Sequence, residues 1–159
     1  MAGILIAFYS RSGNTAAMAE HVAEAARGVA GADVTVKPVG EVDPSALADY
    51  HGIILGSPTY YGLMASEMKA LFDASVVLHG SLEGKVGGAF TSAANRGGGN
   101  ETCLLSILQA MLIHGMVIRG TAQRDHYGPV ALGPPDDRAV AECRKLGRAV
   151  AELAVALHG

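Results

Sequence analysis

The chain has 159 residues, of which half are hydrophobic and 17% are charged, and its formal net charge is -3. This size and composition exclude a disordered chain and predict one folded domain, residues 1–159, with a sizeable core. The mild charge excludes a strongly basic surface, so we expect no nucleic-acid partner and no anionic membrane surface.

Short apolar runs alternate with helical patterns along the chain. Five strands are expected from the apolar runs, at residues 3–9, 33–38, 51–56, 86–92 and 115–119. Four helices are expected from the 3.6-residue periodicity, at residues 14–28, 65–75 and 101–112 and from the capping residue Asp136 onward. We expect a loop at residues 41–50, which could include a short turn of helix, and a second loop, in a segment rich in Gly and Pro, at residues 120–135.

This alternation predicts an α/β fold with a parallel sheet covered on both faces and right-handed crossovers. In such sheets, ligands bind outside the carboxyl ends of the strands, at a topological switch point. The loops after the first, third and fourth strands are therefore the candidate site.

The first loop, Ser10 to Thr15, is rich in hydroxyl groups and precedes a helix. A helix N-terminus leaves backbone N–H groups unpaired and carries a partial positive charge, and Gly13 lets the backbone approach a ligand. These features suit a phosphate, but they suit an ordinary helix cap with a glycine turn equally well. The loop matches neither a Walker A sequence nor GxGxxG.

The second and third loops have unusual compositions. In residues 56–62, Pro58 predicts a sharp turn, and the adjacent Tyr60 and Tyr61 could lie against a flat ring system or pack on neighbouring helices. In residues 91–101, three consecutive glycines cost much backbone entropy, which suits either a flexible loop or one that lies flat against a ligand.

These motifs carry a resemblance to known proteins. The spacing Ser-x-x-Gly-x-Thr-x-x-x-Ala-x-x-Val, from Ser10 to Val22, resembles the flavodoxin signature. The stretch "GSPTYYGLMASEMKALFD", the triple-glycine loop and the "HGMV" that begins at His114 resemble WrbA-type NAD(P)H:quinone oxidoreductases. The resemblance implies a flavodoxin-like three-layer sandwich with a five-stranded parallel sheet in the order 2-1-3-4-5. The long insertion after the second strand of those proteins is missing here, since residues 39–50 bridge it directly.

The resemblance also implies an FMN site made by the three loops and a histidine. Its candidate residues are Ser10, Arg11, Ser12, Gly13, Asn14, Thr15, Pro58, Thr59, Tyr60, Tyr61, Gly62, Ser92, Ala93, Ala94, Asn95, Gly97, Gly98 and His114. On the substrate side the candidates are His114, Tyr127 and His79, and His114 could instead reach a neighbouring subunit's site or simply end its helix. Arg11 or Arg96 could meet a cofactor phosphate or be solvated surface charges. No protein residue is predicted to be catalytic, because the flavin supplies the chemistry.

The implied function is transfer of reducing equivalents from NAD(P)H, as co-substrate, to quinones or similar small acceptors. The alternatives are a flavodoxin-like single-electron carrier and an FMN-binding regulatory module. The lack of an aromatic residue in residues 91–101 leaves one flavin face open and favours the enzyme. The missing insertion puts tetramerisation in doubt, but we still expect a homodimer or tetramer.

Two further features concern the cellular setting. Cys103 and Cys143 form no CxxC pair or ligand cluster, which predicts a reducing compartment and no metal site. The first residues contain no basic segment followed by a long apolar run, so we expect a cytoplasmic protein without membrane insertion.

Overall fold

The computed structural model describes residues 1–159, and each predicted apolar run contributes a strand to one parallel sheet. The strands are β1 (Ala2–Phe8), β2 (Ala32–Pro38), β3 (Gly52–Pro58), β4 (Val86–Ala93), β5 (Val117–Ile118) and β6 (Val130–Leu132). Their order, β2-β1-β3-β4-β5, is the predicted one. The half-exposed strand β2 lies at an edge of the sheet.

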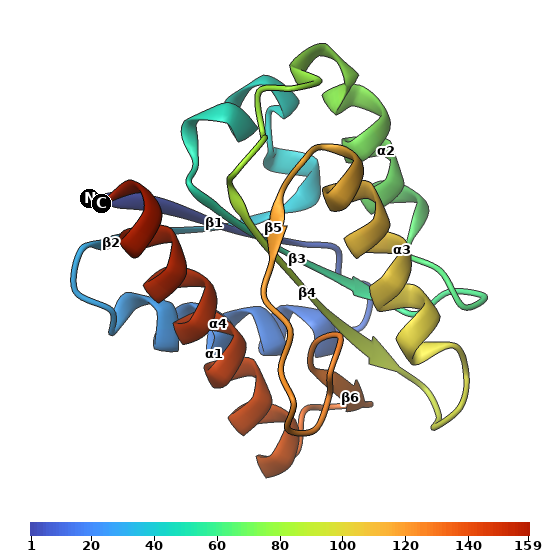
Figure 1. The fold of residues 1–159 in the computed structure, drawn as a ribbon. Coiled ribbons are helices and arrows are strands. Elements are labelled where there is room, and N and C mark those ends of the chain that lie inside the picture. The colour runs from blue at the N-terminus through green and yellow to red at the C-terminus, as the bar shows by residue number, and fades with distance from the viewer.

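Four helices cover the two faces of the sheet. They are α1 (Asn14–Arg27), α2 (Ser66–Ala74), α3 (Asn100–Ile113) and α4 (Asp137–His158). The helices α1 and α4 lie on one face and α2 and α3 on the other (Figure 1). Asp136 caps α4 as predicted, because its Oδ1 accepts a hydrogen bond of 2.8 Å from the Ala139 N–H.

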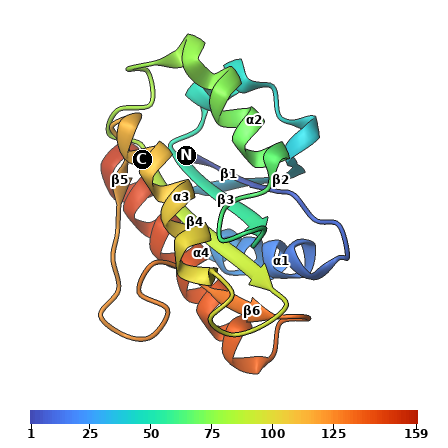
Figure 2. The same cartoon turned by 90° about the vertical axis from the view of Figure 1, so that its right-hand side faces the viewer.

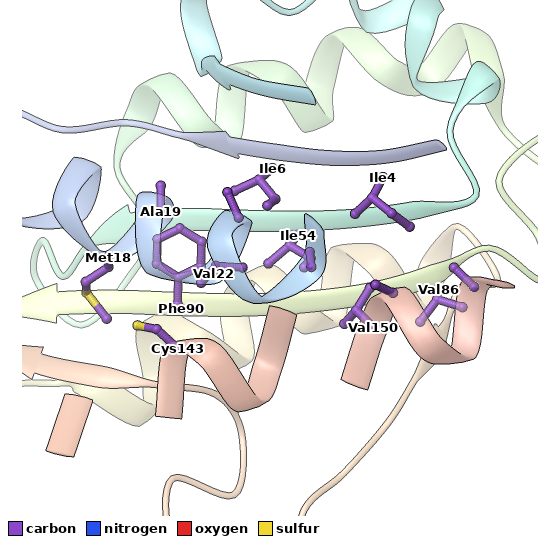
Figure 3. Close-up of a cluster of buried hydrophobic side chains, with 14 of the residues drawn as sticks. Ile4, Ile6, Met18, Ala19, Val22, Ile54, Val86, Phe90, Cys143 and Val150 are labelled. Atoms are coloured by element: carbon purple, nitrogen blue, oxygen red, sulfur yellow. The ribbon is translucent and has the colours of Figure 1, made fainter. Parts of the chain in front are cut away.

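Each face of the sheet has its own apolar core. On the α1 and α4 face, Ile4, Ile6 and Ile54 point from the strands toward Val22 and Val150 of the helices (Figure 3). On the α2 and α3 face, Leu5, Leu55, Met68 and Met111 belong to a second buried cluster. Because both faces are buried, the central strands consist of continuous rather than alternating apolar residues.

In addition to the five predicted strands, the sheet has a sixth, which lies within the segment expected to be a loop. The strand β6 occupies part of residues 120–135 and pairs with β4, and β5 has only two residues. Within residues 41–50, the short turn of helix is a 3-10 helix at Pro44–Asp49. Two more 3-10 helices lie at Val39–Glu41 and Ser75–Leu78.

No helix of the structure combines the length and the apolar character needed to cross a bilayer.

Candidate functional site

The site lies where β1, β3 and β4 end, and the register of the sheet brings these ends level. Phe8 of β1 lies opposite Gly56 of β3, and Pro58 of β3 lies opposite Ser92 of β4. The chain then continues into α1 on one face after β1 and into α2 on the other face after β3, which makes this edge a switch point (Figure 2).

The first loop presents a row of unpaired backbone donors. Gly13, in the left-handed region with φ 96°, is the N-cap of α1 and uses no side chain as a cap. Ser10 Oγ instead accepts from the N–H groups of Gly13 and Ala16, both at 3.2 Å, and so holds the turn in shape. The N–H groups of Arg11, Ser12, Asn14 and Thr15 make no hydrogen bond within the protein. Such a nest at a helix N-terminus is suited to an anion.

The Thr15 hydroxyl connects the first loop to the third. Thr15 is buried, and its Oγ1 lies 2.8 Å from Ser92 Oγ at the end of β4. The sequence suggested the Thr15 hydroxyl as a phosphate donor. In the structure this hydroxyl instead forms a hydrogen bond that joins the first loop to the third. The end of β4 is thereby fixed relative to the start of α1.

A buried hydroxyl network fixes the second loop to the end of β4. Thr91 Oγ1 donates to the Ser57 carbonyl at 2.7 Å and lies 2.8 Å from Thr59 Oγ1. Ser57 Oγ donates to the Pro58 carbonyl and accepts from the Ala65 N–H, each at 2.8 Å. The loop that carries Thr59 therefore leaves the sheet in one fixed direction.

Beyond this network, the second loop ends in a tight two-residue turn. Tyr60 and Leu63 exchange two backbone hydrogen bonds of 3.0 Å, and between them Tyr61 and Gly62 have φ of 51° and 76°. Two successive positive φ angles are typical of a type I′ turn, which explains the glycine at its second position. Tyr61 is strained in this conformation and fully exposed, so its ring contacts no other part of the chain extensively.

Tyr60 takes a different position, against the end of β1. Its ring packs edge to face on Tyr9, with the centroids 6.4 Å apart, and 37% of the residue stays exposed. Loss of solvent around the Tyr9 hydroxyl, together with the neighbouring Glu67 carboxylate, raises the pKa of Tyr9. Of the two tyrosines, Tyr60 is thus the oriented one.

The third loop packs against the second through two glycines. A Cβ at Gly99 would lie 2.4 Å from Gly62 Cα. The two backbones are therefore in direct contact, and a side chain at residue 99 would not fit between them. Gly99 also has a φ of 92° and precedes α3 as its N-cap. The second and third loops therefore form one continuous wall.

The rest of the third loop is held by its own asparagines. Asn100 Oδ1 accepts from the Gly97 N–H at 3.2 Å, and Asn100 Nδ2 donates to the Asn95 carbonyl at 3.3 Å. Ala93 is half-buried, whereas the predicted residues Ala94, Asn95, Gly97 and Gly98 are exposed at the same edge of the sheet. Arg11 and Arg96 are exposed on the first and third loops, and neither makes an ion pair.

The structure does not bring His114 and His79 to these loops. His114 follows α3 at the opposite end of the sheet, with its Nε2 2.8 Å from Ser75 Oγ and its ring 6.2 Å from that of His79. Burial, and secondarily His79, lowers the pKa of His114. Tyr127 lies in the segment between β5 and β6 and lines a cavity beside α4. A role of His114 at a neighbouring subunit's site stays a prediction.

The sequence did not indicate Ser57, Thr91 and Tyr9 as site residues. Ser57 and Thr91 fix the second loop by hydrogen bonds, and Tyr9 orients Tyr60. The available signal was the position of two hydroxyl residues at the ends of otherwise apolar strand runs. Cys103 lies in the same network, with its Sγ 3.7 Å from the Pro58 carbonyl, and burial raises the pKa of its thiol. It is therefore a neutral packing residue and not a nucleophile.

Comparisons with known proteins identify the family of the chain. The family of NADPH-dependent FMN reductases matches residues 44–127. A protein of Caulobacter vibrioides named NAD(P)H dehydrogenase (quinone) is 37% identical over 201 aligned positions, which cover 100% of both chains. A protein of Aquifex aeolicus named flavodoxin is 38% identical over 160 positions, covering 96% of this chain and 86% of its own.

Among solved structures, a flavodoxin, WrbA-like protein from Agrobacterium tumefaciens superimposes with a TM-score of 0.83. It is 25% identical, and the match covers 99% of both chains. The Caulobacter alignment is longer than the 159 residues of this chain, so the relative has positions without a counterpart here. The chain belongs to the NADPH-dependent FMN reductase family and has the flavodoxin-like fold.

Proposed function

We propose that this chain binds FMN at the three loops and passes reducing equivalents from NAD(P)H to quinones or similar small acceptors. The observation that carries the proposal is the nest of unpaired N–H groups at residues 11, 12, 14 and 15, at the switch point of the sheet. The family match and the name of the Caulobacter relative support the same activity.

The first loop fits a terminal phosphate. Four N–H groups without a partner are suited to an anion that has more than one oxygen atom. The partial positive charge at the N-terminus of α1 would add to the attraction of this anion. Ser12 and the Arg11 side chain are exposed beside them and could add further contacts. No lysine is present in the loop, so neutral donors would hold the phosphate, helped at most by one arginine.

The second and third loops would hold the ring system. FMN supplies the redox chemistry when bound, by accepting and donating reducing equivalents. In this proposal Tyr60 and the backbone of Thr59 to Gly62 support one side of the ring, and Ala94 to Gly98 border it. These third-loop residues have short side chains apart from Asn95 and Arg96, and none is aromatic. One face of the ring would stay open to a nicotinamide or a quinone.

We also propose that the chain self-associates through an apolar patch at the opposite end of the sheet. The patch consists of Val76, Val77, Leu112 and Ile113, which are 59–75% exposed. The hydrogen bond between Ser75 and His114 holds the two segments together. Exposed apolar side chains that cluster in this way are typical of an interface.

Steady-state oxidation of NADPH with benzoquinone as acceptor tests the proposed activity. We expect turnover that depends on bound FMN. A protein that binds FMN tightly but oxidises NADPH no faster than free FMN does would be a single-electron carrier, and the enzyme proposal would be wrong.

A further inference from the structure

Along one edge of β4, the pairing with neighbouring strands is interrupted in the middle, between β5 and β6. Val117 lies opposite Val86, whereas Val130 lies opposite Thr91, so the offset between paired residues rises from 31 to 39. Because β3 pairs along the other edge of β4, both β5 and β6 lie on this one. Eight extra residues are thus inserted where an uninterrupted strand would have covered Gly88 to Phe90.

The inserted segment, between β5 and β6, first turns away from the sheet (Figure 2). It returns to β4 at Gly128, where a Cβ would lie 2.1 Å from the Ala89 carbonyl oxygen. Asp125 accepts two hydrogen bonds, of 2.8 and 2.9 Å, from Arg138 of α4 and a third from the Val130 N–H at 3.0 Å. Lys145 of α4 donates to the Gln123 carbonyl at 2.9 Å. The segment is therefore anchored to α4 at two points.

A cavity of about 460 Å³ lies between this segment, the edge of β4 and α4. This volume is within the range of small-molecule sites. Leu108, Ile118 and Leu146 give it an apolar part. The cavity is separate from the flavin loops, since none of residues 10–15, 57–62 or 92–99 lines it.

The charges that line the cavity differ in whether they already have partners. Asp125 is bound to Arg138, and Glu142 is bound to Lys145 at 3.3 Å. The remaining charged groups, Arg119, Arg148 and Glu152, form no ion pair and no hydrogen bond within the protein. The available charge is thus two guanidinium groups against one carboxylate.

From this arrangement we infer that the cavity is a second binding site, which takes a small organic monocarboxylate. The apolar body of the ligand lies against Leu108, Ile118 and Leu146, and its carboxylate is bound by Arg119 and Arg148. Guanidinium groups bind carboxylates through paired, charge-assisted hydrogen bonds. A net surplus of one positive charge favours a monoanion over a dianion, because Glu152 repels a second negative charge.

Benzoate, with benzamide as its neutral counterpart of the same shape, tests this site on the FMN-loaded protein. Binding is followed by NMR shifts of the Ile118 and Leu146 methyl groups and by calorimetry. We expect saturable binding of benzoate but not of benzamide. Arg148→Gln should weaken benzoate binding by about tenfold or more, since it removes the charge-assisted contact. Ala149→Leu, which fills the cavity from α4, should abolish it.

Arg144→Gln is the matched control, because Arg144 lies on the same helix but pairs with Glu24 of α1. It should bind benzoate as the parent protein does. The inference is overturned if benzoate shows no saturable binding at about 10 mM. It is equally overturned if Arg144→Gln and Arg148→Gln weaken binding alike, or if benzoate perturbs the flavin absorbance and leaves the Ile118 methyl unshifted.

Discussion

Gly62 and Gly99 join the second and third loops by direct backbone contact, since a Cβ on Gly99 would lie 2.4 Å from Gly62 Cα. We predict that Gly99→Ala separates the two loops and weakens FMN binding by tenfold or more. The added methyl group meets backbone atoms, which cannot rotate away as a side chain can. Fluorescence titration of the apoprotein with FMN measures the loss.

Gly80→Ala, outside the three loops, is the control for this substitution. Gly80 also has a positive φ, of 88°, but a Cβ there would meet nothing within 4 Å. It should therefore show only the conformational cost of a left-handed alanine, about 1–2 kcal/mol in the free energy of unfolding. Equal losses of FMN affinity in the two variants would show that loop contact is not what matters.

Ser10→Ala tests the phosphate nest. Ser10 Oγ accepts from two backbone N–H groups, and its loss should loosen the turn that aligns the free donors. Because hydrogen bonds to a charged group contribute about 1.5–3 kcal/mol each, we expect FMN affinity to fall at least tenfold. Riboflavin lacks the phosphate and serves as the internal control. If both ligands lose the same affinity, the loop does not hold the phosphate.

His114 predicts a pH dependence of stability. The Ser75 hydroxyl donates to the Phe72 carbonyl at 2.7 Å, so its oxygen accepts from His114 Nε2–H, and buried Nδ1 has no partner. Burial lowers the pKa of His114 below its unfolded value of about 6.5. Below that pH the unfolded state binds more protons, so this contribution is complete above pH 6.5 and is lost as the pH falls toward the folded pKa.

Urea unfolding at pH 7.5 and 5.5, at one protein concentration, checks this sign. His114→Gln can keep a donor for Ser75 but cannot titrate, so the variant should lose less stability between the two pH values than the parent. Burial also lowers the pKa of His51, which therefore supplies a separate part of the loss of stability. His51→Gln is the comparison: it should remove that part and leave the part due to His114. An unchanged loss in His114→Gln would mean that His114 does not titrate differently on unfolding.

The proposed interface predicts a change in oligomeric state. Val77 and Ile113 are each 75% exposed, so lysine at both positions should leave the fold intact while charging the patch. Analytical ultracentrifugation should show a dimer or larger assembly for the parent and a monomer for Val77→Lys with Ile113→Lys. A parent protein that stays monomeric at micromolar concentration would contradict the proposal.

The positions of the strands and helices could be predicted because apolar periodicity reports burial directly, whereas the order of the strands is implied by the resemblance to flavodoxins. Runs such as residues 52–56 are apolar throughout because β3 is covered on both faces. The strand β6 could not be predicted in the same way, since three residues within a segment rich in Gly and Pro carry too little pattern. Its pairing with β4 depends on a register shift that only the folded chain reveals.

The candidate site likewise has a part that could be predicted from the sequence and a part that could not. Loops at the carboxyl ends of strands follow from topology, so the three loops could be located in advance. The bond between Thr15 and Ser92 joins residues 77 positions apart, and local sequence does not encode such a contact. His114 was assigned by resemblance to a motif, which does not state the end of the sheet, or the subunit, at which a residue acts.

The absorbance spectrum of the purified protein, taken without oxygen after incubation with FMN, tests the central claim most directly. We predict the shifted flavin bands of bound FMN, their bleaching by NADPH, and their return on addition of benzoquinone. A protein that takes up no FMN, or whose bound FMN is not bleached by NADPH, would contradict the account.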